Sequence, residues 1–220
     1  MSGNRSRGMP RRSTQAPPRR GIPAPLLLGI GLAVVVVAVI ATMVLTSGRG
    51  GGTQHEPGTA VAVSGAPLPP MTSDGADPAL GATLPTLTGT RMGGGTISIG
   101  PSDAPQVIVV VAHWCPHCQA EVPRIVDWLA ANELPNGAQL VTLSTGIDAA
   151  RPNYPPSAWL AREGWTAPVL TDDAASTALT ALGLNSFPGF VFVNTDGTVA
   201  QRLTGELPVD QIASIAASLR

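Results

Sequence analysis

An unbroken apolar run, residues 107–112 (VIVVVA), leads directly into the segment HWCPHC, which carries Cys115 and Cys118. An apolar run without alternation is typical of a strand covered on both faces, as in a parallel sheet between helices. Beyond the cysteines, apolar residues recur at helical spacing over residues 122–129. The sequence therefore predicts a central strand followed by a helix, with both cysteines at the junction between them.

The rest of the C-terminal half alternates between strand and helix patterns, and the segment NTDG at 194–197 is a hairpin signal. We expect the first helix to end near residue 136, strands at 139–144, 189–193 and 198–203, and helices at 157–162, 174–182 and 209–219. This order predicts an α/β fold, a small central mixed sheet flanked by helices on both faces.

The aromatic residues indicate where the folded domain lies, because all eight of them fall between Trp114 and Phe192. Residues 46–85, by contrast, contain eight glycines and six prolines and show little apolar periodicity. We therefore expect a flexible tether over 46–85 and the folded domain over 86–220.

Residues 26–45 carry no charge, and twenty residues in a helix span roughly the 30 Å of a bilayer core. Residues 1–25 contain six arginines and no acid. By the positive-inside bias, this predicts a cytoplasmic basic segment, a single membrane anchor over 26–45 and an extracytoplasmic C-terminal domain. The alternatives are a cleavable signal peptide and, from the pair Arg19-Arg20, twin-arginine export.

The overall composition excludes two classes of protein. Two cysteines cannot build a disulfide-rich scaffold. A formal net charge of −1 argues against a chain built to coat nucleic acid, so we expect no nucleic-acid partner.

Three motifs resemble the thioredoxin superfamily and, within it, the membrane-anchored TlpA-like thiol-disulfide oxidoreductases. The motifs are Trp114-Cys115-x-x-Cys118, Cys118-x-x-Glu121-x-Pro123 and Phe187-Pro188-Gly189. The resemblance implies a thioredoxin fold, no cofactor, and a cis Pro188 that faces the cysteine pair and supports the substrate backbone. It also assigns substrate contacts to Trp114 and Phe187.

A cysteine at a helix N-terminus has its thiolate stabilised by the helix dipole and by unpaired backbone N–H groups, so Cys115 is the expected attacking sulfur. Cys118, one turn further on, would resolve the mixed disulfide. His117 would stabilise the Cys115 thiolate and so favour the reduced protein. The dipeptide Pro116-His117 also resembles that of the DsbA-type oxidases, which implies disulfide formation.

The opposite direction stays open, because the Glu121-x-Pro123 pattern is similar to that of reductases acting, for example, on apocytochrome c cysteines. In either direction the expected partners are exported protein thiols or disulfides and a membrane redox partner that resets the pair. The sequence identifies no general base for Cys118, since Val109 stands where thioredoxins have a buried aspartate.

Two other classes of function compete with thiol-disulfide exchange. One is a metal site built from His113, Cys115, His117 and Cys118, although a tetrahedral site usually draws its ligands from two separate segments. The other is a binding module whose Cys115–Cys118 bond is merely structural. We expect neither, and we expect no bound metal.

Overall fold

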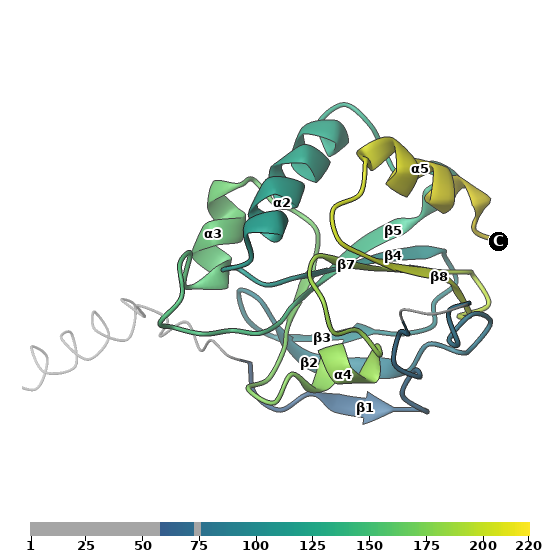
Figure 1. The fold of residues 1–220 in the computed structure, drawn as a ribbon, viewed down its shortest axis with the longest axis horizontal. Helices are drawn as coiled ribbons and strands as arrows, with labels where there is room; N and C mark the ends of the chain where they lie inside the picture. Colours follow the sequence, from purple (N-terminus) through teal and green to yellow (C-terminus); the bar gives the residue numbers. More distant parts are fainter. Residues whose placement is uncertain (1–57, 73–75) are drawn as a thin grey trace, which may run out of the picture. The chain divides into compact units, whose positions relative to one another are not determined.

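A mixed sheet forms the centre of the computed structural model, which describes residues 58–72 and 76–220 (Figure 1). Within these residues the sheet has eight strands in the order β1-β2-β6-β5-β4-β7-β8, and β3 pairs with β2 at the side. The strands are β1 (Ala62–Ser64), β2 (Thr86–Arg91), β3 (Thr96–Ile99), β4 (Gln106–Val111), β5 (Gln139–Ser144), β6 (Val169–Thr171), β7 (Gly189–Val193) and β8 (Val199–Thr204). The helices are α2 (Pro116–Leu129), α3 (Pro156–Arg162), α4 (Thr177–Ala181) and α5 (Val209–Ser218), with a 3-10 turn at Pro135–Gly137.

The strand predicted from the apolar run is the central one. All six residues of β4 are buried, between a parallel neighbour, β5, and an antiparallel one, β7. Successive side chains of β4 enter opposite cores: Ile108 and Val110 face one, and Val107 and Val109 the other. This two-sided burial is why the run lacks the polar alternation of a half-exposed strand.

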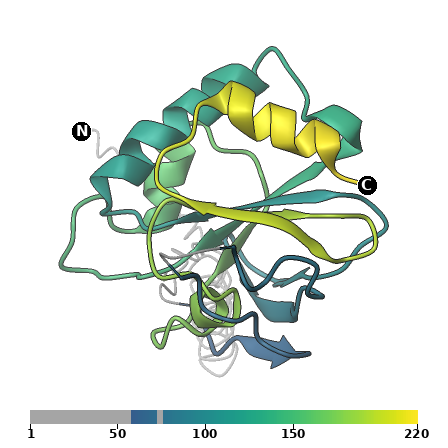
Figure 2. The same ribbon diagram turned by 45° about the vertical axis from the view of Figure 1, so that its right-hand side comes forward.

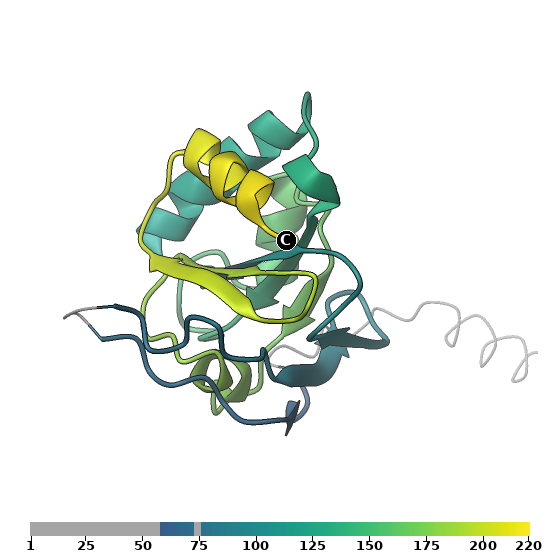
Figure 3. The same cartoon turned by 90° about the vertical axis from the view of Figure 1, so that its right-hand side faces the viewer.

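Helices cover both faces of the sheet, as predicted. Figures 1 and 2 show α2 and α5 on one side of the sheet and α4 on the other, beside β1. The buried residues form two matching clusters, one shared by α2, α3 and α5 and one that contains the buried face of α4. In Figure 3 the chain leaving β8 passes over the edge of the sheet to reach α5. Glu206, in this connection, contacts His117 and Arg124 of α2.

The predicted start of the folded domain at residue 86 is too late. β1 pairs with β2, and Val61, Leu68 and Leu84 are at most 8% exposed, so much of the stretch expected as a tether packs on the domain. Its few apolar residues follow no helical or strand period, because they enter the core from a three-residue edge strand and from loops. The Gly/Pro-rich composition of this stretch therefore led to the prediction of a tether, although these residues are buried.

A buried ion pair fastens this N-terminal stretch to the sheet. Arg202 of β8 has a fully buried side chain, and its Nε donates to Asp77 Oδ2 at 2.9 Å while Nη2 donates to Asp77 Oδ1. A third bond runs from Arg202 Nη1 to the Leu182 carbonyl oxygen at 2.7 Å. The guanidinium beside Asp77 holds the pKa of that carboxyl below its usual value.

The remaining differences from the sequence-based expectation are local. β1, β2, β3 and β6 were not predicted, α2 ends at Leu129 rather than near residue 136, and α4 is shorter than the predicted 174–182. The residue before α4, Ser176, has a left-handed backbone, and the carboxylates of Asp173 and Asp172 accept the N–H groups of Thr177 and Ala178, so the helix begins at Thr177.

The predicted membrane anchor over 26–45, like the cytoplasmic segment before it, lies outside the described residues. Among the residues that are described, none of the helices combines the length and the apolar character needed to cross a bilayer.

Candidate functional site

Cys115 is the residue at which the chain leaves the strand and enters α2. It is the N-cap of the helix, with extended φ/ψ of −75° and 120°, and no side chain caps the first turn. Pro116 follows as the first helical residue, where its missing N–H costs nothing. Cys115 is 7% exposed and Cys118 is not exposed, so Cys115 is the more accessible of the two cysteines. At a helix start the first backbone N–H groups lack intrahelical partners, which is an environment that favours anions.

Cys118 lies one turn into α2 and is fully buried. Its sulfur accepts a hydrogen bond from the Ala112 N–H at 3.5 Å. Burial strongly raises the pKa of the Cys118 thiol, and the nearby Cys115 and Glu121 raise it further against the lowering effect of that hydrogen bond. Cys118 is therefore the protonated, shielded partner of the pair, and both cysteines are free thiols in this structure.

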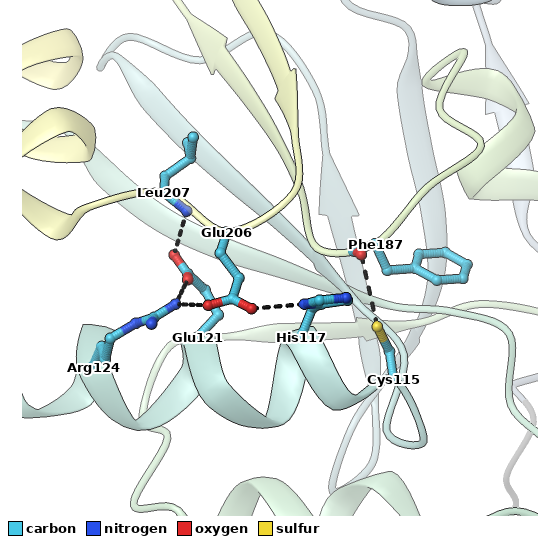
Figure 4. A network of polar contacts seen from close by, with 7 residues as sticks. All are labelled: Cys115, His117, Glu121, Arg124, Phe187, Glu206 and Leu207. Carbon is cyan, nitrogen blue, oxygen red and sulfur yellow. Dashed lines mark hydrogen bonds and ion pairs between the residues drawn. The ribbon is translucent and has the colours of Figure 1, made fainter.

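The loop before β7 closes the site over Cys115. The Phe187–Pro188 peptide bond is cis, as predicted, and Pro188 is buried. The Cys115 thiol donates a weak hydrogen bond to the Phe187 carbonyl oxygen, with a sulfur–oxygen distance of 3.6 Å (Figure 4). The two motifs, about seventy residues apart in the sequence, therefore meet at the sulfur of Cys115.

An aromatic pair flanks the thiol. The rings of Trp114 and Phe187 meet edge to face with centroids 5.9 Å apart, and both side chains are partly exposed. Trp114 Nε1 donates to the Gly146 carbonyl oxygen at 2.6 Å, and the guanidinium of Arg151 lies 4.9 Å from the Trp114 ring. The pair can offer an apolar surface to a peptide bound at Cys115.

His113 is a structural residue rather than a member of a metal site. Its Nε2 accepts the Asp148 N–H at 3.2 Å, so Nδ1 carries the proton and donates to the Pro152 carbonyl oxygen at 2.7 Å. Burial lowers the pKa of His113, in keeping with a neutral ring. Both ring nitrogens are thus occupied, and within the described part of the chain no three His, Cys, Asp or Glu side chains are grouped as a metal site requires.

Glu121 is a site residue whose role the sequence did not reveal. It follows Cys118 by three residues on the same helix, so the two side chains share a face, and Glu121 is fully buried. Its Oε1 accepts the Leu207 N–H at 3.3 Å, and its Oε2 accepts a hydrogen bond from Arg124. The motif placed Glu121 in the family pattern, but only packing against the chain after β8 shows that its carboxylate is buried beside a thiol.

His117 and Pro116 are the exposed members of the predicted set. The side chain of His117 is 69% exposed, and its Nδ1 lies 2.7 Å from Oε1 of Glu206, a residue that the sequence analysis did not single out. The other oxygen of Glu206 accepts a hydrogen bond from Arg124 at 2.6 Å. Figure 4 shows these side chains along α2, with Glu206 between His117 and Arg124, and Arg124 in turn bonded to Glu121.

A buried thiol and a nearly buried one at the start of a helix, beside a cis-proline loop, can interconvert between dithiol and disulfide while the chain stays folded. The fold and this site together define the class of the thioredoxin-fold thiol-disulfide oxidoreductases. The family model described as Redoxin matches residues 79–219, and the chain belongs to that family.

Solved structures share this fold at low sequence identity. StoA from Bacillus subtilis is 18% identical, with a TM-score of 0.50 over 62% of this chain and 98% of that chain. The thioredoxin domain of a thiol-disulfide oxidoreductase from Bacteroides vulgatus is 16% identical, with a TM-score of 0.50 over 64% of this chain and 96% of that chain. A thiol:disulfide interchange protein of the thioredoxin family from Chlorobium tepidum is 18% identical, with a TM-score of 0.50 over 66% of this chain and 98% of that chain. No curated protein matches the sequence.

Proposed function

We propose that this protein is a membrane-anchored thiol-disulfide oxidoreductase that exchanges disulfides with exported proteins on the outer side of the membrane. The observation that carries the proposal is the placement of Cys115 at the N-terminus of α2, with buried Cys118 behind it and the cis Phe187–Pro188 peptide in front. The location rests on the sequence of residues 1–45, namely six arginines followed by an uncharged stretch. The similar structures from Bacteroides vulgatus and Chlorobium tepidum are of a thiol-disulfide oxidoreductase and a thiol:disulfide interchange protein, which supports this chemistry.

In the oxidising direction, a substrate thiolate attacks the sulfur of Cys115 in the Cys115–Cys118 disulfide. The bond between the two cysteines breaks, Cys118 leaves with its electron pair and takes up a proton, and a mixed disulfide links Cys115 to the substrate. A second substrate thiolate then attacks the substrate sulfur of this bond and releases the Cys115 thiolate. The substrate loses two electrons, the protein gains them, and a membrane redox partner must remove them before the next cycle.

Glu121 is the group we assign to the proton of Cys118. Cys118 is buried, and burial raises the pKa of its thiol, so a bare thiolate there is unfavourable. A carboxyl group one turn away on the same helix face can, when protonated, donate a proton as Cys118 leaves, and as the resulting carboxylate it can take the proton back when Cys118 attacks. This assignment supplies the base that was missing at the position of Val109.

The exposed Pro116-His117 dipeptide favours disulfide formation as the net direction, because a cationic or hydrogen-bonding His117 stabilises the thiolate of the reduced protein. The alternative is a reductase that opens disulfides of exported proteins, such as those between apocytochrome c cysteines. The Glu121-x-Pro123 pattern within α2 favours this alternative.

Two substitutions and one equilibrium measurement test the proposal. Cys115→Ser should abolish dithiol exchange, and Cys118→Ala should accumulate mixed disulfides that can be identified by mass; normal turnover in either variant would refute the assignment. Equilibration of the couple against glutathione buffers then gives the direction. A reduction potential of about −120 mV indicates an oxidase, and one at or below about −270 mV indicates a reductase.

A further inference from the structure

Glu206 bridges two side chains of α2 from outside the helix. It lies in the loop between β8 and α5, and its Oε1 accepts the His117 Nδ1–H at 2.7 Å while its Oε2 accepts from Arg124 Nη2 at 2.6 Å. The same Nη2 of Arg124 also donates to Oε2 of Glu121 (Figure 4). One guanidinium nitrogen is therefore shared between an exposed carboxylate and a fully buried one.

We propose that Glu206 is a positioning residue of the disulfide exchange: by sharing Arg124 with Glu121, it keeps Glu121 basic enough to take the proton of Cys118. The inference rests on the proposed function and deepens it, because it names the group that sets the strength of the base. The side chain of Glu206 is linked to that of Glu121 through Arg124, and it touches no reacting atom.

The need for such a group follows from the burial of the thiol. Burial raises the pKa of Cys118, so a base that accepts its proton must itself have a high proton affinity. A guanidinium devoted to Glu121 alone would lower that affinity by stabilising the anionic carboxylate. Glu206 counteracts this effect, because its negative charge binds the outer side of the same nitrogen and repels the anion of Glu121.

The exposed fractions of Glu121, Arg124 and Glu206 agree with a buried base that is adjusted by a carboxylate at the surface. The side chain of Glu121 is fully buried, whereas those of Arg124 and Glu206 are 47% and 33% exposed. Glu206 is thus ionised, and hydrogen bonds from His117 and then Arg124 lower the pKa of its carboxyl. A charged carboxylate at the surface can adjust a buried one through Arg124 without itself being desolvated.

His117 completes the row at its exposed end. Because Nδ1 donates to Glu206, Nε2 is the ring nitrogen left to gain or lose a proton. In the described residues, the titratable side chains joined to Glu121 by hydrogen bond or electrostatic contact are Arg124 and Cys118 from α2, and Glu206 extends the row to His117. A change of charge on the Glu206 side chain is therefore expected to reach Glu121 through Arg124.

The simplest competing account treats these contacts as surface ion pairs, which are commonly worth about 0–1 kcal/mol and have no effect on chemistry. The two accounts differ in kinetics rather than in stability. They can be separated by following how fast Cys118 displaces glutathione from Cys115.

The experiment uses the full-length chain in detergent, reduced and then mixed with oxidised glutathione over a range of pH. Acid quenching and mass analysis separate the formation of the Cys115–glutathione mixed disulfide from its closure, in which the Cys118 thiolate attacks Cys115 and glutathione leaves as a thiolate. We expect Glu206→Gln to slow closure about fivefold to tenfold, a size typical of groups coupled in one network. We also expect the acid limb of the closure rate to move to lower pH, because loss of the negative neighbour makes Glu121 more acidic.

The matched control is Glu133→Gln, which removes an exposed carboxylate beyond the end of α2 and should leave both steps unchanged. In a Glu121→Gln background, Glu206→Gln should have no further effect on closure, because its only route to Cys118 has been removed. A slower closure without a shift of the acid limb, or an equal loss in the Glu121→Gln background, would overturn the inference. A wild-type chain that forms no mixed disulfide at all would instead overturn the proposed function.

Discussion

Removal of the Asp77 carboxylate should strongly destabilise the domain, because it leaves the guanidinium of Arg202 buried without a counter-ion. Arg202 has no exposed side-chain surface and Asp77 only 13%, and two of the three hydrogen bonds recorded for that guanidinium end on Asp77. Removal of one partner of a buried ion pair costs about 3–5 kcal/mol in the free energy of unfolding. Because Asp77 is partly exposed, we expect Asp77→Ala to lose about 3 kcal/mol. For a domain of this size, the midpoint of thermal unfolding should fall by roughly 6–12 °C.

The double variant Asp77→Leu with Arg202→Met tests the cause. If the loss comes from the stranded charge, replacement of both partners by apolar side chains should restore most of the stability. Asp103→Ala, at an exposed loop position, should change the free energy of unfolding by no more than about 0.5 kcal/mol. Denaturant unfolding followed by circular dichroism measures all three. A Asp77→Ala variant as stable as the loop control, or a double variant less stable than the single one, would refute the reasoning.

The Asp77–Arg202 ion pair makes the stability of the domain depend on pH, in a direction that follows from the pKa of Asp77. Arg202 lowers the pKa of Asp77 in the folded chain below the ordinary value of an aspartate. The stabilisation by this pair is therefore fully present above the unfolded pKa of about 3.9, and it is lost as the pH falls through the lower folded value. Asp77→Asn should accordingly show a weaker loss of stability on acidification than the wild type.

Three further predictions concern the cysteines, a buried glycine and the exposed histidine. In the reduced chain, an alkylating reagent should modify Cys115 and spare Cys118, because Cys118 is fully buried and burial raises the pKa of its thiol; peptide mass mapping would show this. Gly183→Ala should cost more stability than Gly137→Ala in denaturant unfolding. Both glycines have φ near 65°, which costs an alanine about 1 kcal/mol, but only at Gly183 would the new Cβ meet a backbone oxygen, at 2.4 Å. His117→Ala should lower the reduction potential of the couple measured against glutathione, because the reduced protein loses a group that stabilises its thiolate; an unchanged potential would remove His117 from the mechanism.

The sequence determined the parts of this protein that depend on local patterns. The apolar run of β4, the helical spacing after Cys118 and the hairpin signal at 194–197 each specify an element through residues that are neighbours in the chain. All three elements form, although α2 ends at Leu129 and not near residue 136. The strands that escaped prediction are short or polar; β2, for example, reads TLTGTR and contains a glycine in its middle. Such a strand is held by its partners on both sides rather than by its own pattern.

At the site, too, some features could be predicted from local sequence patterns and others could not. The spacing of Cys115 and Cys118 at a strand-to-helix junction was enough to predict a dithiol with an attacking and a shielded sulfur, because helix geometry fixes both positions. The cis peptide before Pro188 was predicted only through the family resemblance, since no spacing rule brings residue 188 to residue 115. The folded chain brings the peptide before Pro188 to Cys115, whose thiol donates to the Phe187 carbonyl oxygen.

Only the tertiary structure decided which charges matter. The motif singled out Glu121 but did not show that its carboxylate is buried, and nothing in the sequence distinguishes Glu206 from an ordinary loop residue. The chain after β8 crosses to α2, buries the first carboxylate and leaves the second at the surface, with Arg124 between them. The periods of helices and strands depend on residues that are neighbours in the chain. Burial and ion pairing depend on segments that meet only when the sheet has formed, and burial and ion pairing determine the strength of a base.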